Sequence, residues 1–234
     1  MGNRITNTRY GMMLYPERDE VIGKNLLLYG EWYQSEMDCM KPYIPQGGVC
    51  IDVGANIGCH TLFFARQVGS GGAVIAFEPQ RVLFQILCAN IALNDFRNIE
   101  AFSSAVGQKS DTLFFPPCDY DQPGNFGMIG RSREGVPVNQ VCLDDFQFSR
   151  IDLMKIDVEG MEPEVLLGAK KTIGKHRPVI YLEYHPETHS CDLREILKGL
   201  DYELQEHLAP GYNPLNMKNE SKNVHGNFLE RNLL

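Results

Sequence analysis

The chain has 234 residues, of which 43% are hydrophobic, and it carries a formal net charge of −8. This length allows one α/β domain with a buried core and requires no second domain. The negative charge and the lack of a Lys and Arg cluster exclude nucleic acid as the expected main partner.

The seven cysteines are scattered and form no CxxC pair, as is typical of reduced packing residues. No apolar run approaches the length of a membrane span, and the N-terminus lacks the apolar centre of a signal peptide. The sequence therefore predicts a cytoplasmic protein without stable membrane insertion. Its oligomeric state stays open.

The first part of the chain is predicted to form a cap over the core. Residues 9–28 fit a hairpin that turns at the sequence YPERDE, and residues 33–43 fit a helix that leads to the first core strand. We therefore expect one domain, with residues 1–46 as the cap and residues 47–234 as the ligand-binding core.

A nucleotide-type βαβ unit follows the cap. The sequence VCIDVGANIGCHTLFFA predicts an apolar strand, a loop and an amphipathic helix, and AVIAFEP predicts a second apolar strand. Glycines let the loop backbone approach a ligand, and an acid that ends the second strand, here Glu78, accepts hydrogen bonds from ribose hydroxyls. The unit fits a dinucleotide or S-adenosylmethionine (SAM). Its candidate binding residues are Asp52, Gly54, Ala55, Asn56, Gly58 and Glu78.

Two residues of this loop distinguish the two ligands. A dinucleotide would place its pyrophosphate beside the Asp52 carboxylate, which would repel it, whereas the ammonium and sulfonium groups of SAM would be attracted. Asn56 stands at the second glycine position of the dinucleotide pattern, where a side chain would crowd a pyrophosphate. We therefore predict SAM as the cofactor. An NAD-dependent oxidoreductase and a non-catalytic SAM-binding module are the alternatives.

Helices and strands alternate after the βαβ unit, which predicts a doubly wound, mostly parallel sheet. An irregular stretch rich in Gly, Pro and Asp interrupts this alternation and is interpreted as a substrate loop. The pattern predicts helices over residues 82–92 and 163–173, strands over 99–103, 151–158 and 178–184, and the substrate loop over 116–137.

The segments IDVGANIG, AFEP, NIALN, LDDF, LMKIDVEGMEPEVLLGA and RPVIYLEYH, in this order, resemble the FkbM-type family of SAM-dependent methyltransferases over residues 29–202. The resemblance implies a Rossmann-like class I methyltransferase with a seven-stranded sheet whose last strand is antiparallel. It also implies methylation of a hydroxyl oxygen on a small acceptor, such as a sugar, a glycolipid or a polyketide-type natural product. It does not name the acceptor.

The same resemblance assigns further residues to the cofactor. It places Glu78, followed by Pro79, at the ribose, and Ser104 with Ala105 near the adenine. Thr61 and Asn94 also match positions of the family pattern. A local role is equally compatible with both, Thr61 in the first turn of a helix and Asn94 as a helix C-cap.

Three residues of the cap, Glu31, Trp32 and Glu36, resemble a family segment that closes over the cofactor or the acceptor. Trp32 is equally compatible with a packing role. In the substrate loop, residues 119–130 combine turn residues, aromatics and acids that suit a polyhydroxyl acceptor, and Asn125 is the candidate contact there.

Ionisable residues at two strand ends are predicted to converge on one site. Alternation along a strand places Lys155, Asp157 and Glu159 on one face, while Glu183 and His185 share one side of the next strand. Charges on a core strand cost stability unless they are paired or used. The group is therefore either a catalytic site or a buried ion-pair network centred on Lys155.

The catalytic interpretation has two forms. His185 is a candidate base for the acceptor hydroxyl, because the reference pKa of histidine is about 6.5. Alternatively, Asp157, Glu183 and His185 hold Mg or Mn, which lowers the pKa of that hydroxyl. We favour metal-free chemistry and assign the other histidines, His60 included, to structural roles.

Overall fold

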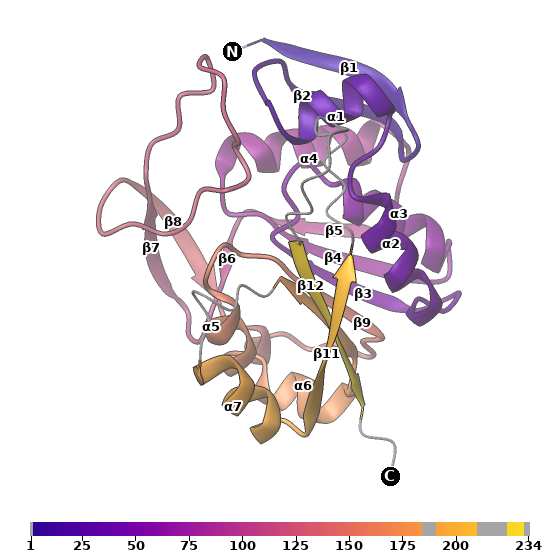
Figure 1. Ribbon diagram of the computed structural model, residues 1–234, viewed down its shortest axis with the longest axis vertical. Helices are drawn as coiled ribbons and strands as arrows, with labels where there is room; N and C mark the ends of the chain where they lie inside the picture. Colours follow the sequence, from indigo (N-terminus) through magenta and orange to yellow (C-terminus); the bar gives the residue numbers. More distant parts are fainter. Residues whose placement is uncertain (1, 184–190, 210–223, 232–234) are drawn as a thin grey trace.

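The computed structural model describes residues 2–183, 191–209 and 224–231. In these ranges seven strands form one central sheet, in the order β11-β12-β10-β9-β3-β4-β5 (Figure 1). The neighbours from β10 to β5 pair in parallel, whereas β12 runs antiparallel to β10 and β11. The predicted parallel α/β sheet is confirmed. The strands are β3 (Val49–Val53), β4 (Ala73–Phe77), β5 (Ile99–Phe102), β9 (Leu153–Ile156), β10 (Val179–Glu183), β11 (Tyr202–Ala209) and β12 (Val224–Arg231).

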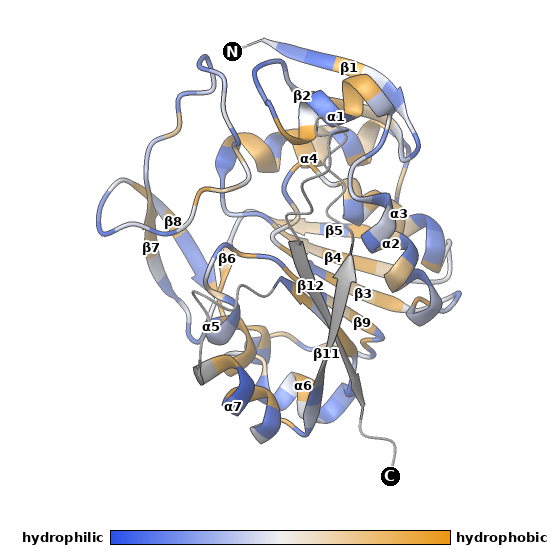
Figure 2. Cartoon of the chain, in the orientation of Figure 1, coloured by the Kyte–Doolittle hydropathy of each residue, from blue (hydrophilic) through white to orange (hydrophobic). Residues whose placement is uncertain are grey.

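Side chains alternate between the two faces of this sheet, and each face has its own hydrophobic cluster. Cys50 and Leu153 pack with the N-terminal segment and α3, whereas Ile51 and Met154 pack with α5, α6 and α7. Figure 2 shows the inner strands β3, β4 and β9 as largely hydrophobic, as expected for strands that are covered on both faces. The helices around the sheet are α3 (Cys59–Val68), α4 (Arg81–Leu93), α5 (Glu162–Leu167), α6 (Lys170–His176) and α7 (Cys191–Gly199).

The helix predicted over residues 163–173 is wrong in one respect, because it is two helices, α5 and α6, separated at Gly168. In a continuous helix the Thr172 amide would donate to the Gly168 carbonyl. Here that carbonyl accepts the Asp144 amide at 2.9 Å, and the Thr172 amide donates to the Asp144 carboxylate at 2.8 Å. A tertiary contact therefore breaks the helix, and no local sequence signal marks it.

The N-terminal segment, residues 2–46, folds against the face of the sheet that α3 covers. Its hairpin turns at Arg9 and Tyr10, so the predicted turn at YPERDE is wrong; that sequence covers the last two residues of β2 and the four residues after it. The early turn is fixed by Thr8, whose hydroxyl accepts the Tyr10 amide and donates to the Gly11 carbonyl. The division of the chain at residue 46 stays a prediction. The segment contains β1 (Asn3–Thr8), β2 (Gly11–Pro16), α1 (Ile22–Tyr29), α2 (Gln34–Met40) and the 3-10 helix η1 (Lys41–Tyr43).

A second, three-stranded sheet in the described residues lies beside the carboxyl ends of the central strands and has the order β6-β8-β7. The predicted substrate loop is the connection between β7 and β8, residues 116–135, which we call the β7–β8 loop. Its Gly124 forms a β-bridge with Asp19 of the N-terminal segment. None of the helices in the described ranges is long and apolar enough to cross a membrane. The added elements are β6 (Ala105–Val106), β7 (Asp111–Phe115), β8 (Val136–Val141) and the 3-10 helix η2 (Leu143–Asp145).

Candidate active site

A cavity of about 360 Å³ lies at the carboxyl ends of β3, β4, β9 and β10. Its wall combines the loop after β3 and the residues that end β4, β9 and β10. It also includes parts of α2 and the β7–β8 loop. Open α/β sheets bind ligands at this edge. One cavity thus joins the predicted cofactor loop to the predicted acidic strand ends.

The loop after β3 has a backbone that few side chains would permit. Gly54 has a φ of +80°, and a Cβ atom there would lie 1.8 Å from the Asp157 carbonyl oxygen. Gly58, with a φ of +96°, has the Leu87 side chain 2.6 Å from its Cβ position. Asn56 is also left-handed, with a φ of +52°. The loop therefore packs directly against the end of β9, and Ala55 and Asn56 line the cavity beside it.

Glu78 directly follows β4 and is buried in the cavity wall. Its carboxylate accepts the backbone amides of Asn56 and Gln80, both at 2.8 Å. Burial raises the pKa of Glu78 to about 7, although these two hydrogen bonds oppose the rise. The carboxylate thus links the loop after β3 to the end of β4. The neighbouring wall residues include Pro79, Ser104 and Ala105, as the sequence predicted for the cofactor end.

Asp52 is placed differently from the prediction. Its side chain is 0% exposed and absent from the cavity wall, so the expectation that it faces a ligand from outside the close-packed interior is wrong. Its two oxygens lie 3.3 Å from Lys155 Nζ and 2.6 Å from the donating Thr61 hydroxyl. Because Lys155 offsets its charge, Asp52 does not separate SAM from a dinucleotide. Thr61 likewise has the local role, as a hydrogen-bond donor to Asp52.

Lys155 is the centre of a buried ionic network. Its side chain is 2% exposed, and its ammonium lies 3.3 Å from Asp52, 3.2 Å from Asp157 and 3.2 Å from the Gly54 carbonyl. Burial alone would lower the pKa of Lys155, but Asp157 and Asp52 outweigh it and raise the pKa. The ammonium therefore ties β3 to β9 at the cavity wall, as the structural interpretation of this group predicted.

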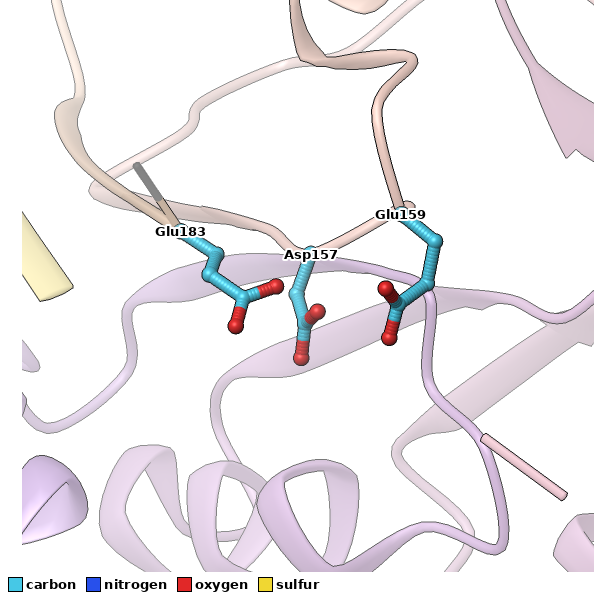
Figure 3. A group of neighbouring side chains, drawn as sticks. All are labelled: Asp157, Glu159 and Glu183. Atoms are coloured by element: carbon cyan, nitrogen blue, oxygen red, sulfur yellow. The ribbon is translucent and has the colours of Figure 1, made fainter. Parts of the chain in front are cut away.

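Three carboxylates gather above Lys155, and Figure 3 shows Asp157, Glu159 and Glu183 turned toward one another. Their nearest oxygens all lie within 4.8 Å of one another. Burial, together with Asp157 and Glu159, raises the pKa of Glu183 to about 10, and burial raises that of Glu159 to about 7. Desolvation also acts on Asp157, but Lys155 and a hydrogen bond with Glu183 outweigh it and lower its pKa. Glu183 thus holds a proton that it shares with an ionised Asp157.

Glu159 joins the three carboxylates through a turn and not through a strand. The strand predicted over residues 151–158 ends earlier, because β9 stops at Ile156. Glu159 is left-handed, with a φ of +52°, and Glu162 accepts the amides of Val158 and Gly160 at 3.1 and 3.3 Å. The buried Glu162 was missed because nothing in the local pattern marks it. The possible oxygen ligands for a cation are Asp157, Glu159 and Glu183. The predicted third ligand, His185, lies outside the described residues.

The N-terminal segment contributes one of its two predicted acids to the cavity. Glu36, on α2, lies in the wall with its Oε2 atom 3.3 Å from His60 Nε2. Glu31 is not among the wall residues and pairs with Arg9 at 3.2 Å, so its contact with the acceptor stays a prediction. Trp32 lines the cavity and also packs on Tyr33, at 4.4 Å between ring centres.

The β7–β8 loop reaches the cavity through Asn125, Gly127, Met128 and Ile129. Gln80 holds this loop, because its side-chain amide donates to the Phe126 carbonyl at 2.9 Å and its oxygen accepts the Tyr120 hydroxyl at 3.1 Å. Sequence reasoning missed Gln80. Its position two residues after Glu78 was the available signal.

Asn94 is the C-cap of α4 and joins that helix to the hairpin. Its side chain accepts the Met12 amide at 3.0 Å and donates to the Met12 carbonyl at 2.8 Å. It is not among the cavity wall residues. The local alternative is therefore confirmed for Asn94.

Comparison with solved structures gives the fold class. Methyltransferase FkbM from Methylobacillus flagellatus KT superposes with a TM-score of 0.54 at 18% identity, covering 79% of this chain and 44% of that chain. A Streptococcus mutans protein solved in complex with SAH, S-adenosylhomocysteine, gives 0.52 at 12% identity, covering 84% and 96%. At these identities the likeness shows the methyltransferase-like α/β fold alone.

The sequence gives the family. Residues 52–204 match the Methyltransferase FkbM domain, and the chain belongs to this family of SAM-dependent methyltransferases. Methyltransferase sdnD of Sordaria araneosa is 28% identical over 164 residues, which cover 53% of this chain and 61% of that protein. The chain thus spans about 60% of the length of this curated relative.

Proposed function

We propose that the protein transfers a methyl group from SAM to a hydroxyl oxygen of a small, carbohydrate-like acceptor. The observation that carries this proposal is that one cavity spans both ends of the site. It joins a glycine-containing loop and a buried ribose-type acid, Glu78, to a group of carboxylates at the neighbouring strand ends. Its volume, about 360 Å³, is in the range of small-molecule sites.

The cofactor end of the cavity fits SAM. The left-handed backbone at Gly54, Asn56 and Gly58 leaves the loop open to close approach by a ligand. Glu78 has a carboxylate suited to accept hydrogen bonds from ribose hydroxyls, and Ser104 and Ala105 line the cavity beyond it. When bound, SAM supplies the electrophilic methyl group on its sulfonium.

The acceptor end is acidic. Asp157, Glu159, Glu183 and Glu36 line it, and Lys155 already contacts two carboxylates. Carboxylates accept hydrogen bonds from hydroxyl groups and repel phosphate or carboxylate groups. This supports an uncharged polyhydroxyl acceptor, with Asn125 as a further polar contact, and it disfavours phosphorylated acceptors and nucleic acid.

A divalent cation also fits the oxygen ligands offered by Asp157, Glu159 and Glu183, since Mg and Mn prefer such ligands. However, the Lys155 ammonium, 3.2 Å from Asp157, already supplies positive charge at this place. We therefore propose metal-free transfer, in which these residues position the acceptor.

The test begins with the cofactor. SAH is expected to raise the melting temperature and NAD to leave it unchanged, because only a ligand of the native state stabilises it. Transfer of tritiated methyl from SAM is then measured on alkyl glycosides, their phosphorylated analogues and polyketide alcohols. Stabilisation by NAD but not by SAH would contradict the proposal, as would transfer restricted to phosphorylated acceptors.

A further inference from the structure

His60 occupies a place in the cavity wall that its predicted structural role does not explain. It stands in the first turn of α3, directly after Cys59, the first residue of that helix. Its side chain is only 9% exposed and lines the same cavity as Asp157. Within the described residues, its Nε2 atom makes no hydrogen bond, although Glu36 Oε2 lies 3.3 Å away.

His60 and Glu36 each have an aromatic neighbour. The His60 ring lies 6.0 Å from the Phe64 ring one turn along α3. Glu36 also acts electrostatically on the buried Tyr181 and helps to raise the pKa of its hydroxyl. The imidazole and the carboxylate come from the core and from the N-terminal segment, respectively, and they meet at the cavity. This arrangement places an imidazole nitrogen beside a partly buried acid that can stabilise it once protonated.

Three other ionisable groups in the wall are poorly suited to take a proton from the acceptor. Glu183, with its pKa raised to about 10 by burial and by its acidic neighbours, already holds one at neutral pH. Asp157 is paired with Lys155, and its pKa is lowered, which makes it a weak base. Lys155 stays protonated because its own pKa is raised.

Glu78 and Glu159, with pKa values raised to about 7, could also take a proton. The carboxylate of Glu78 already accepts two backbone amides at the cofactor end. His60 differs from Glu159 because it has an acid, Glu36, beside it that can stabilise its charged, protonated form.

We propose that His60 Nε2 accepts the proton of the acceptor hydroxyl and that Glu36 stabilises the resulting imidazolium; this rests on the proposed methyl transfer. The acceptor oxygen forms a bond to the methyl carbon while the bond from that carbon to sulfur breaks. The electron pair of the broken bond stays on sulfur, which gives neutral SAH, and the hydroxyl proton moves to Nε2. Glu36 is a positioning residue in this step.

NMR of the His60 imidazole tests the proposal without an acceptor. Its imidazole faces Glu36 of α2, and it acts electrostatically on Asp157 after β9. Glu36→Gln is expected to change the ¹⁵N chemical shift of His60 Nε2, because it removes the carboxylate that lies 3.3 Å from this nitrogen. An Nε2 shift that is the same in Glu36→Gln and in the wild type would overturn the proposal.

Turnover gives the second measurement, with tritiated SAM and n-octyl β-D-glucopyranoside as the probe acceptor. His60→Gln is expected to lower turnover by about 100-fold. Its SAH affinity, measured by calorimetry, should stay within about threefold of the wild type. Imidazole added to His60→Ala should restore part of the activity. His176→Gln, a histidine of α6 outside the cavity wall, is the matched control.

The outcomes separate the two proposals. If the wild type does not bind SAH, the proposed function fails. If SAH binds but His60→Gln keeps turnover within about threefold of the wild type, only the assignment of His60 fails. If the glucoside is not methylated, the NMR comparison of the wild type with Glu36→Gln still decides on His60.

Discussion

The two ends of the cavity are built in different ways. At the cofactor end the backbone sets the shape, through left-handed residues such as Gly54 and Gly58 and through amides that bind Glu78. At the acidic end side chains set the chemistry, and they arrive from α2, from the residues that follow β9 and from β10. The cofactor end is thus determined by a short stretch of sequence, whereas the acidic end depends on how distant elements pair and pack.

The two ends are nevertheless in direct contact at Gly54. Its carbonyl accepts a hydrogen bond from Lys155 Nζ at 3.2 Å, and the Asp157 carbonyl fills the space where its Cβ would stand. A mutation in the buried network should therefore lower the unfolding free energy and, through Gly54, also disturb the loop at the cofactor end. A change confined to the wall should alter binding alone.

The largest effect is expected from Lys155→Met. It leaves Asp52 buried without its cation, and breaking a buried ion pair from one side costs about 3 to 5 kcal/mol of unfolding free energy. Urea denaturation measures this loss. Lys109→Met is the control, because Lys109 is 74% exposed and solvent screens its ion pair with Asp111. Equal losses in the two variants would show that the network does not stabilise the fold.

Asp52→Ala follows the same logic. If Asp52 only attracted SAM, its replacement by alanine would hardly change the unfolding free energy. Asp52 is instead fully buried between Lys155 and Thr61, so its removal should destabilise the fold by an amount comparable to that of Lys155→Met. An Asp52→Ala protein that melts normally and only binds SAH more weakly would contradict this buried role.

Gly54→Ala should cost about 3 kcal/mol of unfolding free energy, because the new methyl group meets backbone and the φ of +80° is strained for alanine. It should also weaken SAH binding, since the loop and the end of β9 must separate. Gly174→Ala provides the control, as its Cβ position in α6 has nothing within 4 Å. Thermal unfolding with and without SAH measures both effects, and a normal melting temperature for Gly54→Ala would refute the close contact.

The contrast between the two ends also explains what the sequence could predict. Apolar periodicity and turn residues are local signals, so the parallel sheet, the loop after β3 and the position of Glu78 were predictable. The burial of Asp52 was not, because it depends on Lys155 being its neighbour across the β3 and β9 pairing, about a hundred residues along the chain.

The same reason applies to the pair formed by Glu36 and His60. Each residue has an unremarkable local context, and only the packing of α2 on the core brings them to 3.3 Å. Glu159 is an intermediate case. Its participation was predicted from strand alternation, whereas the structure delivers it through a left-handed turn.

Glu78→Gln should weaken SAH binding by about 2 kcal/mol while the fold is retained, because hydrogen bonds to a charged acceptor are lost. Calorimetry measures the affinity. Glu134→Gln, in the exposed part of the β7–β8 loop, should bind SAH as the wild type does. Unchanged affinity in Glu78→Gln would place the ribose elsewhere.

The pKa of Glu78 adds a pH dependence. It is raised from 4.5 to about 7 in the free protein, so folding favours the protonated form and this group's contribution to stability falls as pH rises through that interval. Ribose hydroxyls favour the carboxylate, so SAH affinity should increase from about pH 6 to about pH 8. Glu159 titrates nearby, with a pKa of about 7. Glu78→Gln removes only the contribution of Glu78 to the pH dependence of SAH affinity, so any dependence that remains in this variant belongs to other groups such as Glu159.

The smallest effect is expected from chelation. Lys155 supplies a fixed positive charge 3.2 Å from Asp157, so methyl transfer should proceed unchanged in EDTA, and titration with MnCl₂ should show no saturable binding. Glu159→Gln and the exposed Glu134→Gln should then respond identically to Mn. If Mn bound the wild type and Glu134→Gln but not Glu159→Gln, and EDTA abolished transfer, the acidic end would be a metal site. The comparison of the two ends would then change, because a cation and not side chains alone would set the chemistry of the acceptor end.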